Sequence, residues 1–306
     1  MQEPNLQHLT VGGPAANTGA PRRMAFWDWR CTAGESEHIV VCVHGLSRQG
    51  RDFDTLARAL SERARVIAVD VAGRGESDWL ADPMAYQLPT YGADLAALLV
   101  HLRTQAPGAA IDWVGTSMGG LIGMALSAQP ALAPRRLVLN DVGPSIQWEA
   151  LQRIATYFGQ NPSFDSEQAA VDYLTSISTA FGPHTPEQWR ALSRPLLRER
   201  DGRWWLHYDP AIALPVKALV GMEDQAAARQ VARDGEAALW GLYDAITART
   251  LLLRGQQSDL LSELTAAEMG QRGPKAHCVV FEGVGHAPTL VADDQVRVVR
   301  DFLWSE

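Results

Sequence analysis

The sequence predicts an α/β protein whose sheet is doubly wound and mostly parallel. From residue 24 onward, short apolar runs alternate with amphipathic stretches. Strands that are apolar on both faces are typical of a parallel sheet covered by helices on both sides. The alternation stops between residues 140 and 250, where no convincing buried strand is found. This interval indicates a helical insertion.

The strands expected in the sheet are short apolar or β-branched runs. They span residues 24–29, 38–44, 65–71, 111–115, 136–140, 250–254 and 277–282. Helices are expected where apolar side chains recur every three or four positions. They span residues 52–64, 91–104, 118–128, 236–247, 264–271 and 293–304. The first 23 residues, rich in Pro, Gly, Asn and Thr, indicate an extended arm.

Residues 143–235 are predicted to form a helical lid, or cap, inserted into a core made of residues 1–142 and 236–306. The helices of the lid are expected at residues 146–157, 166–178, 185–198 and 225–233, separated by prolines and glycines. Four lid side chains are too apolar for a free surface, namely Trp148, Trp189, Trp204 and Trp205. We therefore expect them to face the core or a cavity beneath the lid.

Composition and charge exclude several classes of protein. The 306 residues carry 27 basic and 35 acidic side chains, with a pI near 5.5. This balance argues against a nucleic-acid partner, because phosphate binding needs a basic face. Cys31, Cys42 and Cys278 indicate neither a disulfide framework nor an ordinary zinc site. No apolar run reaches the roughly 18 residues of a membrane helix, and residues 1–13 lack a secretion signal. We expect a cytoplasmic protein with no membrane partner, and a homodimer is compatible with the sequence.

Ser117 is the candidate nucleophile. It stands in the motif Gly115-Thr-Ser-Met-Gly119, between an apolar strand and a helical run. A serine in this position occupies a sharp strand-to-helix turn and projects its hydroxyl from the strand end. Glycines suit both flanking positions, because a Cβ there would collide where the helix packs closely on the strand. A serine that merely caps the helix is the alternative interpretation.

His286 is the candidate base that takes the serine proton. It follows the last strand on a glycine-rich loop, at the sheet edge where catalytic groups of parallel sheets collect. The acid that orients the imidazole is expected to be Asp259, which follows the preceding strand through a turn that begins at Gly255. Asp141, directly after the strand before that, is the rival candidate, and its alternative role is to bond loop backbone behind the site.

The oxyanion hole is expected to consist of two backbone N–H groups, those of Met118 and Leu46. Met118 begins the helix after the nucleophile, and Leu46 lies in the loop that follows an earlier strand, as this architecture requires. Ser47, Arg48 and the lid residue Trp148 are the candidate substrate-binding residues. For Arg48, an ion pair with a buried acid is the plainer alternative.

Together these motifs resemble the α/β-hydrolase superfamily, in particular a bacterial branch of lid-bearing serine hydrolases. The resemblance extends from residue 24 to residue 306. It rests on residues 44–45, 70–77, 115–120, 139–144 and 207–210, with Asp259 and His286. It implies an eight-stranded sheet whose first two strands lie in the N-terminal region, with the lid inserted after strand 6. It also implies hydrolysis through a covalent acyl-serine, with no cofactor and no metal.

Differences between this sequence and the motifs of other enzyme families exclude several functions. Serine at the nucleophile position argues against haloalkane dehalogenases and epoxide hydrolases, which resemble this fold but use aspartate. Asp78 replaces the last glycine of a dinucleotide fingerprint. We expect an enzyme that hydrolyses small to medium carboxylic esters. Lactone opening, C–C bond or amide hydrolysis, or acyl transfer by the same triad is the alternative, because a triad does not fix the bond that is cleaved. A non-catalytic binding protein of the same fold is the third hypothesis.

Overall fold

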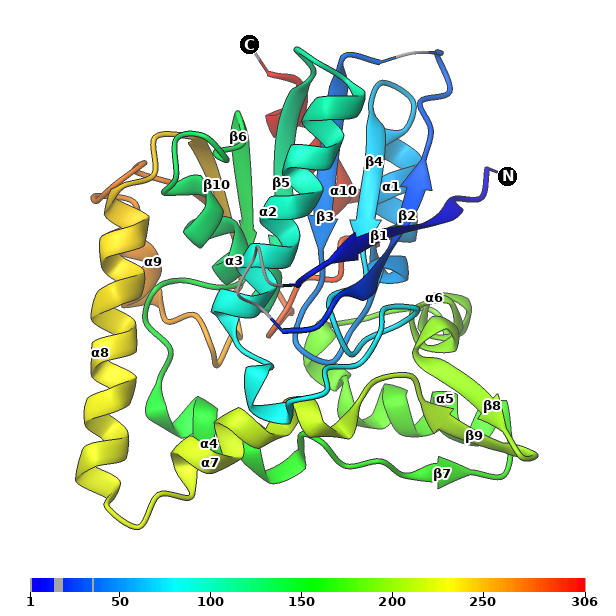
Figure 1. Ribbon diagram of the computed structural model, residues 1–306, viewed down its shortest axis with the longest axis vertical. Helices are drawn as coiled ribbons and strands as arrows, with labels where there is room; N and C mark the ends of the chain where they lie inside the picture. Colours follow the sequence, from blue (N-terminus) through cyan, green and yellow to red (C-terminus); the bar gives the residue numbers. More distant parts are fainter. Residues whose placement is uncertain (1, 14–18, 35, 306) are drawn as a thin grey trace.

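The computed structural model describes residues 2–13, 19–34 and 36–305, and an eight-stranded sheet lies at its centre (Figure 1). In spatial order the strands are β1 (Asn5–Val11), β2 (Arg22–Trp29), β4 (Arg65–Val69), β3 (His38–Val43), β5 (Ala110–Thr116), β6 (Arg136–Asn140), β10 (Arg249–Gly255) and β11 (His277–Phe281). Strand β2 pairs antiparallel with both β1 and β4, and all other neighbours pair parallel. The predicted mostly parallel sheet is confirmed.

Helices cover both faces of this sheet, because successive strand residues point to opposite sides. In β3, Ile39 and Val41 join a hydrophobic cluster with four helices, whereas Val40 and Cys42 join a second cluster with two others. The first face carries α2 (Leu88–Gln105), α3 (Met118–Ser127), α8 (Gln225–Asp244) and α9 (Glu263–Met269), and the second carries α1 (Asp54–Leu60) and α10 (Asp293–Trp304). The sheet is therefore doubly wound, as expected.

The segment between β6 and β10 forms an insertion that contains more than the expected helices. Its elements are α4 (Trp148–Tyr157), β7 (Ser163–Phe164), α5 (Glu167–Ile177), α6 (Pro186–Ser193), β8 (Leu197–Arg200), β9 (Arg203–Leu206) and α7 (Leu214–Val220). Strands β7, β9 and β8 form a small antiparallel sheet. The helix expected over 185–198 ends at Ser193, because Pro195 follows and the chain turns into β8. Short 3-10 turns stand at Gly50–Phe53, Pro83–Ala85, Thr179–Phe181, Arg194–Leu196 and Pro210–Ala213.

The hairpin between β8 and β9 has a sequence signal of its own, which was not among the expected elements. Asp201 and Gly202 connect the strands, and both have positive φ, at 52° and 71°. An Asp-Gly pair at such positions is a strong signal for a two-residue hairpin turn. The adjoining residues, Arg-Glu-Arg and Trp-Trp-Leu, are too polar or too short to read as a buried strand.

Helix α8 spans the boundary between lid and core that was expected between Gly235 and Glu236. It runs without a break over Gln225–Asp244, and a Cβ at Gly235 would meet no atom within 4 Å. Its second half buries Trp240 and Tyr243 in the main core. The glycine is therefore a tolerated helix residue rather than a boundary, and the expected division at this point is wrong.

The N-terminal arm is partly a strand. Residues 5–11 pair antiparallel with β2, which adds β1 to the edge of the sheet. Residues 14–18 of the expected arm lie outside the described residues. The two N-terminal strands implied by the family resemblance are β1 and β2.

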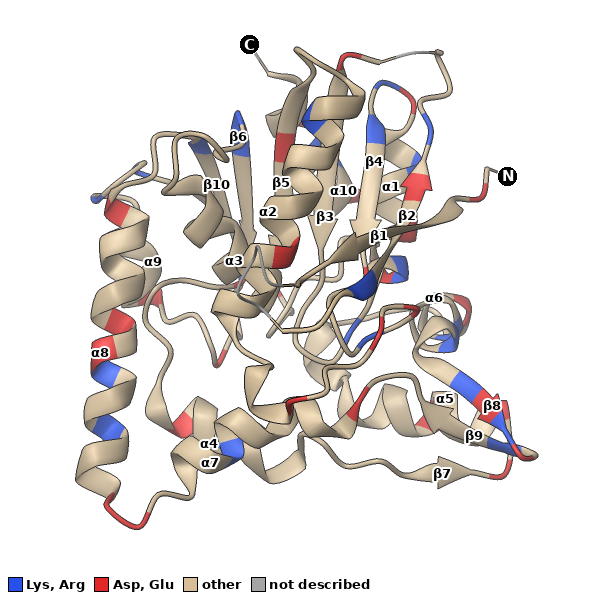
Figure 2. Ribbon diagram, in the orientation of Figure 1, with Lys and Arg blue, Asp and Glu red and all other residues tan. Residues whose placement is uncertain are grey.

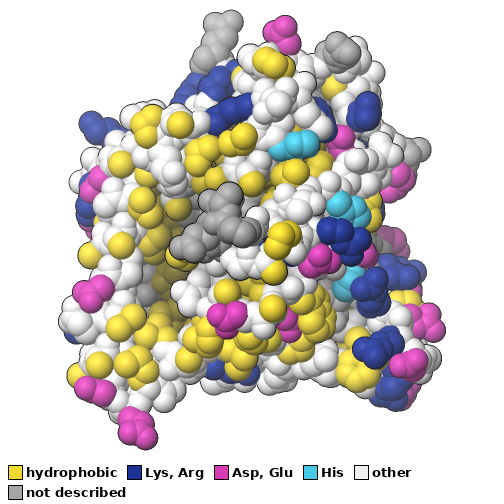
Figure 3. Space-filling model, viewed as in Figure 1, with side chains coloured by type: hydrophobic (Ala, Val, Ile, Leu, Met, Phe, Trp, Pro, Cys, Tyr) yellow, Lys and Arg dark blue, Asp and Glu magenta, His cyan; other side chains and the backbone are white. Residues whose placement is uncertain are grey.

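The insertion lies against the carboxyl ends of the parallel strands, in green and yellow in Figure 1. Hydrophobic side chains gather on its surface over α4 and α7 in Figure 3, where Tyr157 and Leu214 are exposed. Within the described ranges, none of the helices is both long and apolar enough to cross a membrane. The edge beneath the insertion is where the candidate site residues meet.

Candidate active site

Ser117 stands between β5 and α3, in the sharp turn that the sequence predicts. Its φ of 51° and ψ of −116° are strained for a residue with a side chain. A Cβ at Gly115 would collide with the carbonyl of Gly119, and one at Gly119 would collide with the carbonyl of Val43. The two glycines therefore let α3 approach the strands closely enough to fix the turn.

His286 lies on the loop after β11 and faces the serine. Its Nε2 is 2.9 Å from Ser117 Oγ. The loop is held at two points: Gly285 N–H donates to the carbonyl of Ala180 at 2.6 Å, and the carbonyl of Pro288 accepts from Asn140 Nδ2 at 2.8 Å. The imidazole thus reaches the hydroxyl across the sheet edge, as expected.

The carboxylate beside the imidazole belongs to Asp141, and the expectation that it would be Asp259 is wrong. His286 Nδ1 lies 2.8 Å from Asp141 Oδ2. Asp141 is fully buried, and its carboxylate also accepts from Gly255 N–H at 2.8 Å and from Ser258 Oγ at 2.6 Å. The acid directly after β6 therefore has a fixed orientation toward the histidine.

Asp259 instead points to the surface. Its side chain is 54% exposed and forms an ion pair with Arg153 of α4 at 2.8 Å. The residue before it, Ser258, occupies the position next to the buried carboxylate and donates to it. The sequence held a signal for the correct acid, because Asp141 follows its strand with no intervening turn, whereas Asp259 comes four residues after Gly255. Ser258, which positions Asp141, was missed.

Two backbone N–H groups near Ser117 are available as hydrogen-bond donors. Met118 is the first residue of α3, where N–H groups have no partner within the helix. Leu46 lies in the loop after β3, and its carbonyl accepts from Arg74 Nε at 2.9 Å. Among the described residues, neither N–H donates to another backbone group. The oxyanion hole that the sequence predicts from these two groups stays a prediction.

The loop that carries Leu46 is anchored by a buried histidine. His44 Nδ1 lies 2.6 Å from the carbonyl of Gly45, and Val71 N–H donates to His44 Nε2 at 3.0 Å. Burial lowers the pKa of His44 to about 3, with a smaller contribution from the nearby Arg74 and Arg48 charges and an opposing one from the Gly45 hydrogen bond. The ring is therefore neutral, donates through Nδ1 and accepts through Nε2.

Arg48 is committed to an ion pair, which agrees with the plainer of the two interpretations. Its guanidinium donates to Asp52 at 2.6 and 2.8 Å, and to the carbonyl of Leu192 in the insertion at 3.0 Å. It also lies over the ring of Phe181, 5.5 Å from the centroid. Arg48 thus ties the loop after β3 to the insertion.

A small cavity of about 40 Å³ lies between the catalytic loops and the insertion. Its lining comes from both, namely His44, Arg48, Asp52, Phe53, Thr116, Phe181, Leu192, Ala287, Pro288 and Thr289. His184 of the insertion bonds to Thr289 Oγ1 at 2.7 Å. The insertion therefore lies against residues adjacent to both Ser117 and His286.

The remaining candidate residues lie apart from this hydrogen-bonded centre. Ser47 is half-buried and does not line the small cavity. Trp148 of α4 is buried beneath Arg229, whose guanidinium carbon lies 5.1 Å from the ring centroid. The other three lid tryptophans are only half-buried. In the described ranges, no group of three or more His, Cys, Asp or Glu side chains could hold a metal ion.

The fold and this arrangement of a hydroxyl, an imidazole and a carboxylate at the carboxyl edge of a parallel sheet are typical of α/β hydrolases. The sequence pattern of the alpha/beta hydrolase family matches residues 40–300. The chain belongs to this family, and it is a hydrolase.

Relatives with known names agree with this class. The chain is 43% identical over 284 residues to a 3-hydroxybutyrate-oligomer hydrolase from Cupriavidus necator, with 92% of each chain covered. It is 30% identical to an esterase from Mycobacterium tuberculosis, with 98% of this chain and 92% of that protein covered. Among solved structures, an alpha/beta hydrolase from Novosphingobium aromaticivorans superposes with a TM-score of 0.81 at 33% identity and covers 99% of both chains.

Proposed function

We propose that this chain is a serine esterase that cleaves the ester linkages of short 3-hydroxybutyrate oligomers through an acyl-enzyme on Ser117. The observation that carries the proposal is the pair of hydrogen bonds that joins Ser117 Oγ to His286 and His286 to Asp141, at 2.9 and 2.8 Å. The substrate class is supported by the relative that is 43% identical and is named for it.

The first half of the reaction transfers the acyl group to the enzyme. His286 Nε2 takes the proton of Ser117 Oγ as the oxygen attacks the ester carbonyl carbon. Asp141 keeps the Nδ1 proton of the ring in place and stabilises the imidazolium that forms. The carbonyl oxygen gains a negative charge, which the N–H groups of Met118 and Leu46 stabilise. When the C–O bond breaks, His286 returns the proton to the departing 3-hydroxyl oxygen.

The second half repeats these steps with water. His286 takes a proton from a water molecule as its oxygen attacks the acyl carbon on Ser117. The same N–H groups stabilise the second tetrahedral intermediate. The bond from the acyl carbon to Ser117 Oγ then breaks, and His286 returns the proton to the serine. The products are an acid and a shorter hydroxy acid, and the enzyme is regenerated.

The substrate is expected to enter between the lid and the catalytic loops. The cavity there is only about 40 Å³, which is smaller than ordinary ligand pockets of hundreds of Å³. Binding an oligomer therefore requires the lid to move outward. Ser47, Arg48 and Trp148 are proposed to act on substrate binding, and Arg48 does so by holding Leu192 of the lid in place.

The experiment that tests the proposed function is a product assay. The purified chain is incubated with linear dimers and trimers of 3-hydroxybutyrate, and with p-nitrophenyl esters of increasing acyl length. Release of monomeric 3-hydroxybutyrate, absent with the Ser117→Ala variant, is the expected result. Hydrolysis of p-nitrophenyl esters without release of monomer would support the esterase activity but contradict the oligomer as its substrate. The cytoplasmic location and the homodimer stay predictions.

A further inference from the structure

An open pocket of about 580 Å³ lies at the amino ends of the parallel strands, at the edge opposite Ser117. Its lining is basic and aromatic, with His38, Arg63, Arg135, Arg136, Arg249, Leu303, Trp304 and Ser305. Arg136 begins β6 and Arg249 begins β10, so their blue segments stand at the upper ends of these strands in Figure 2. The proposed esterase mechanism uses none of these residues.

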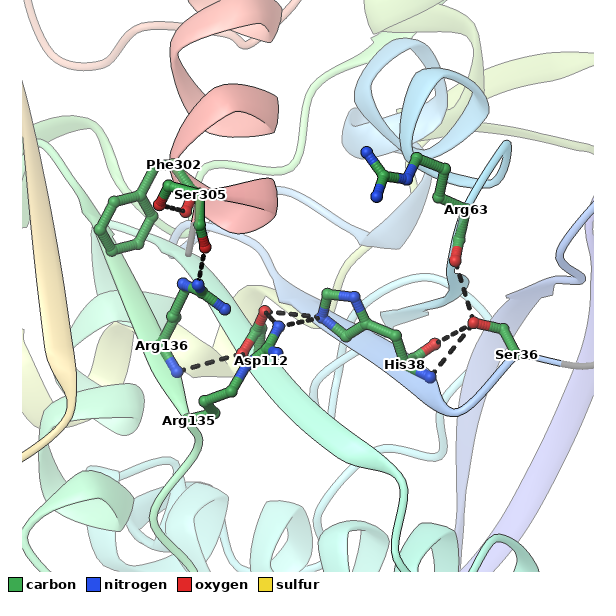
Figure 4. Close-up of polar contacts among 8 residues, drawn as sticks. All are labelled: Ser36, His38, Arg63, Asp112, Arg135, Arg136, Phe302 and Ser305. Carbon is green, nitrogen blue, oxygen red and sulfur yellow. Dashed lines mark hydrogen bonds and ion pairs between the residues drawn. The ribbon is translucent and has the colours of Figure 1, made fainter.

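Among the described residues drawn in Figure 4, Asp112 is the acid that approaches this group, and its acceptor capacity is already used. The carboxylate accepts from Arg135 Nε at 3.1 Å and Nη2 at 2.8 Å, and from Arg136 backbone N–H at 3.1 Å. Its Oδ2 also lies 2.6 Å from His38 Nε2. Asp112 therefore balances the charge of Arg135 but does not contact the guanidinium of Arg136.

Arg136 is left with unsatisfied donors. The residue is 7% exposed, and its Nη2 donates to the carbonyl of Ser305. Its Nε and Nη1 are buried and have no hydrogen-bond partner. Burial lowers the pKa of Arg136, and the adjacent Arg135 charge lowers it further. A buried, charged donor without an acceptor is costly, because the group has lost its water.

A second guanidinium reaches the pocket from another direction. Arg63, which follows α1, is exposed and lies over the ring of Trp304, 5.1 Å from the centroid. His38 meets the edge of the same ring at 4.9 Å. The tryptophan thus forms an apolar wall against the Arg63 and His38 side chains. In Figure 4 the guanidinium of Arg136 lies next to Ser305.

We propose that this pocket is a binding site for a small phosphate-bearing anion, held by Arg136 and Arg63. Guanidinium groups from different elements suit the tetrahedral, multiply charged phosphate group, because each keeps its positive charge and can offer N–H donors. The chain as a whole carries a net charge of -8. Its long-range field therefore does not attract polyanions, which favours a small ligand that fits the pocket over nucleic acid.

Calorimetric titration of the full chain tests the proposal, at constant ionic strength, with inorganic phosphate, inorganic pyrophosphate, glycerol 3-phosphate and citrate. Saturable binding of pyrophosphate at one site per chain is expected, with citrate weaker. Arg136→Gln should weaken pyrophosphate binding by at least about tenfold, because it removes a charge-assisted donor pair. Arg63→Gln, an exposed substitution that leaves the buried groups intact, should weaken it several-fold.

Arg233→Gln is the matched control, because it makes the same change of charge on α8, where Arg233 is exposed and bonds to Gln230. It should bind pyrophosphate as the unmodified chain does. Tighter binding of glycerol 3-phosphate than of inorganic phosphate would support the site and identify an organic phosphate as its ligand. The proposal is overturned if no saturable binding is seen, if citrate binds as tightly as pyrophosphate, or if Arg63→Gln and Arg233→Gln behave alike.

Discussion

The molecule contains two histidine–aspartate pairs, one at each end of the parallel strands. At the carboxyl end, His286 Nδ1 lies 2.8 Å from Asp141; at the amino end, His38 Nε2 lies 2.6 Å from Asp112. Both aspartates are fully buried. The two pairs differ in what each imidazole contacts besides its aspartate. His286 faces the hydroxyl of Ser117, whereas His38 lies against Trp304 and Arg135.

This difference indicates that the surroundings of the pair, rather than the pair itself, decide what it can do. Ser117 stands in a strained turn beside unused N–H groups, so in the proposed mechanism a proton transfer to His286 activates it as the nucleophile. Ser36, beside the other pair, bonds to main-chain atoms of His38 and Arg63 rather than to the imidazole. The amino-end pair therefore has no activated hydroxyl, and its role is to hold charges.

Removing the Ser117 hydroxyl should cause the largest loss of kcat. Ser117→Ala is expected to lower kcat for ester hydrolysis by about 10⁶-fold, because His286 and Asp141 then have no nucleophile to serve. Initial rates with a p-nitrophenyl ester measure this. Ser36→Ala is the matched control at the other pair and should leave the rate unchanged. Full activity of Ser117→Ala would contradict the proposal that the pair beside Ser117 differs from the pair beside Ser36 by activating a nucleophile.

Replacing the acid beside His286 should cause the next largest loss of kcat. Asp141→Asn is expected to lower kcat by about 10⁴-fold, because an amide favours the wrong imidazole tautomer. Asp259→Asn should change kcat by less than about twofold, since it loses one exposed ion pair. Steady-state kinetics on both variants, with circular dichroism to verify folding, make the comparison. The opposite ranking would restore Asp259 as the acid.

At the amino end of the strands, Asp112→Asn is the substitution that corresponds to Asp141→Asn, and it should affect stability rather than kcat. Burial alone would raise the pKa of Asp112, but hydrogen bonds from His38 and Arg135 hold that pKa below its ordinary value. A lowered carboxyl pKa adds stability at neutral pH that is lost as the pH falls below about 4. Asp112→Asn should therefore reduce the free energy of unfolding by roughly 3 kcal/mol at pH 7, and by less in acid. Urea unfolding at several pH values tests this, and an equal loss at every pH would contradict it.

The effect of His44 should appear as a slope in the pH dependence of stability. Because its pKa in the folded chain is about 3, whereas the unfolded chain takes up this proton near pH 6.5, stability is lost as the pH falls between these values. His44→Gln should remove roughly 1 kcal/mol of this loss per pH unit. The difference between the unfolding curves of the two proteins isolates the effect from other groups. Parallel curves would mean that the folded His44 titrates normally.

Much of the fold could be predicted because its strands are apolar on both faces. The strand at residues 136–140 and the helix at residues 293–304 were expected with the ends that the structure has. The small sheet of the insertion could not be predicted in the same way. Its strands β8 and β9 are short, charged and half exposed, so they lack the apolar pattern that marks a strand.

Ser117 and His286 could be predicted because local sequence marks them: spaced glycines around the serine, and a glycine-rich loop at the histidine. The acid carries no comparable mark. Asp141 and Asp259 both follow strands, and the choice depends on which of them the turn after Gly255 directs inward. In the structure, Ser258 points inward and Asp259 points outward. That one-residue difference is set by tertiary packing.

The central claim is that Ser117 carries the acyl group, and mass spectrometry of the enzyme during turnover tests it most directly. The chain is mixed with a p-nitrophenyl ester, quenched in acid within one turnover, and digested for peptide mapping. An acyl group is expected on the peptide that contains Ser117, in an amount that matches the burst of p-nitrophenol. Turnover without any adduct on that peptide, or an adduct on another residue that persists in Ser117→Ala, would contradict it.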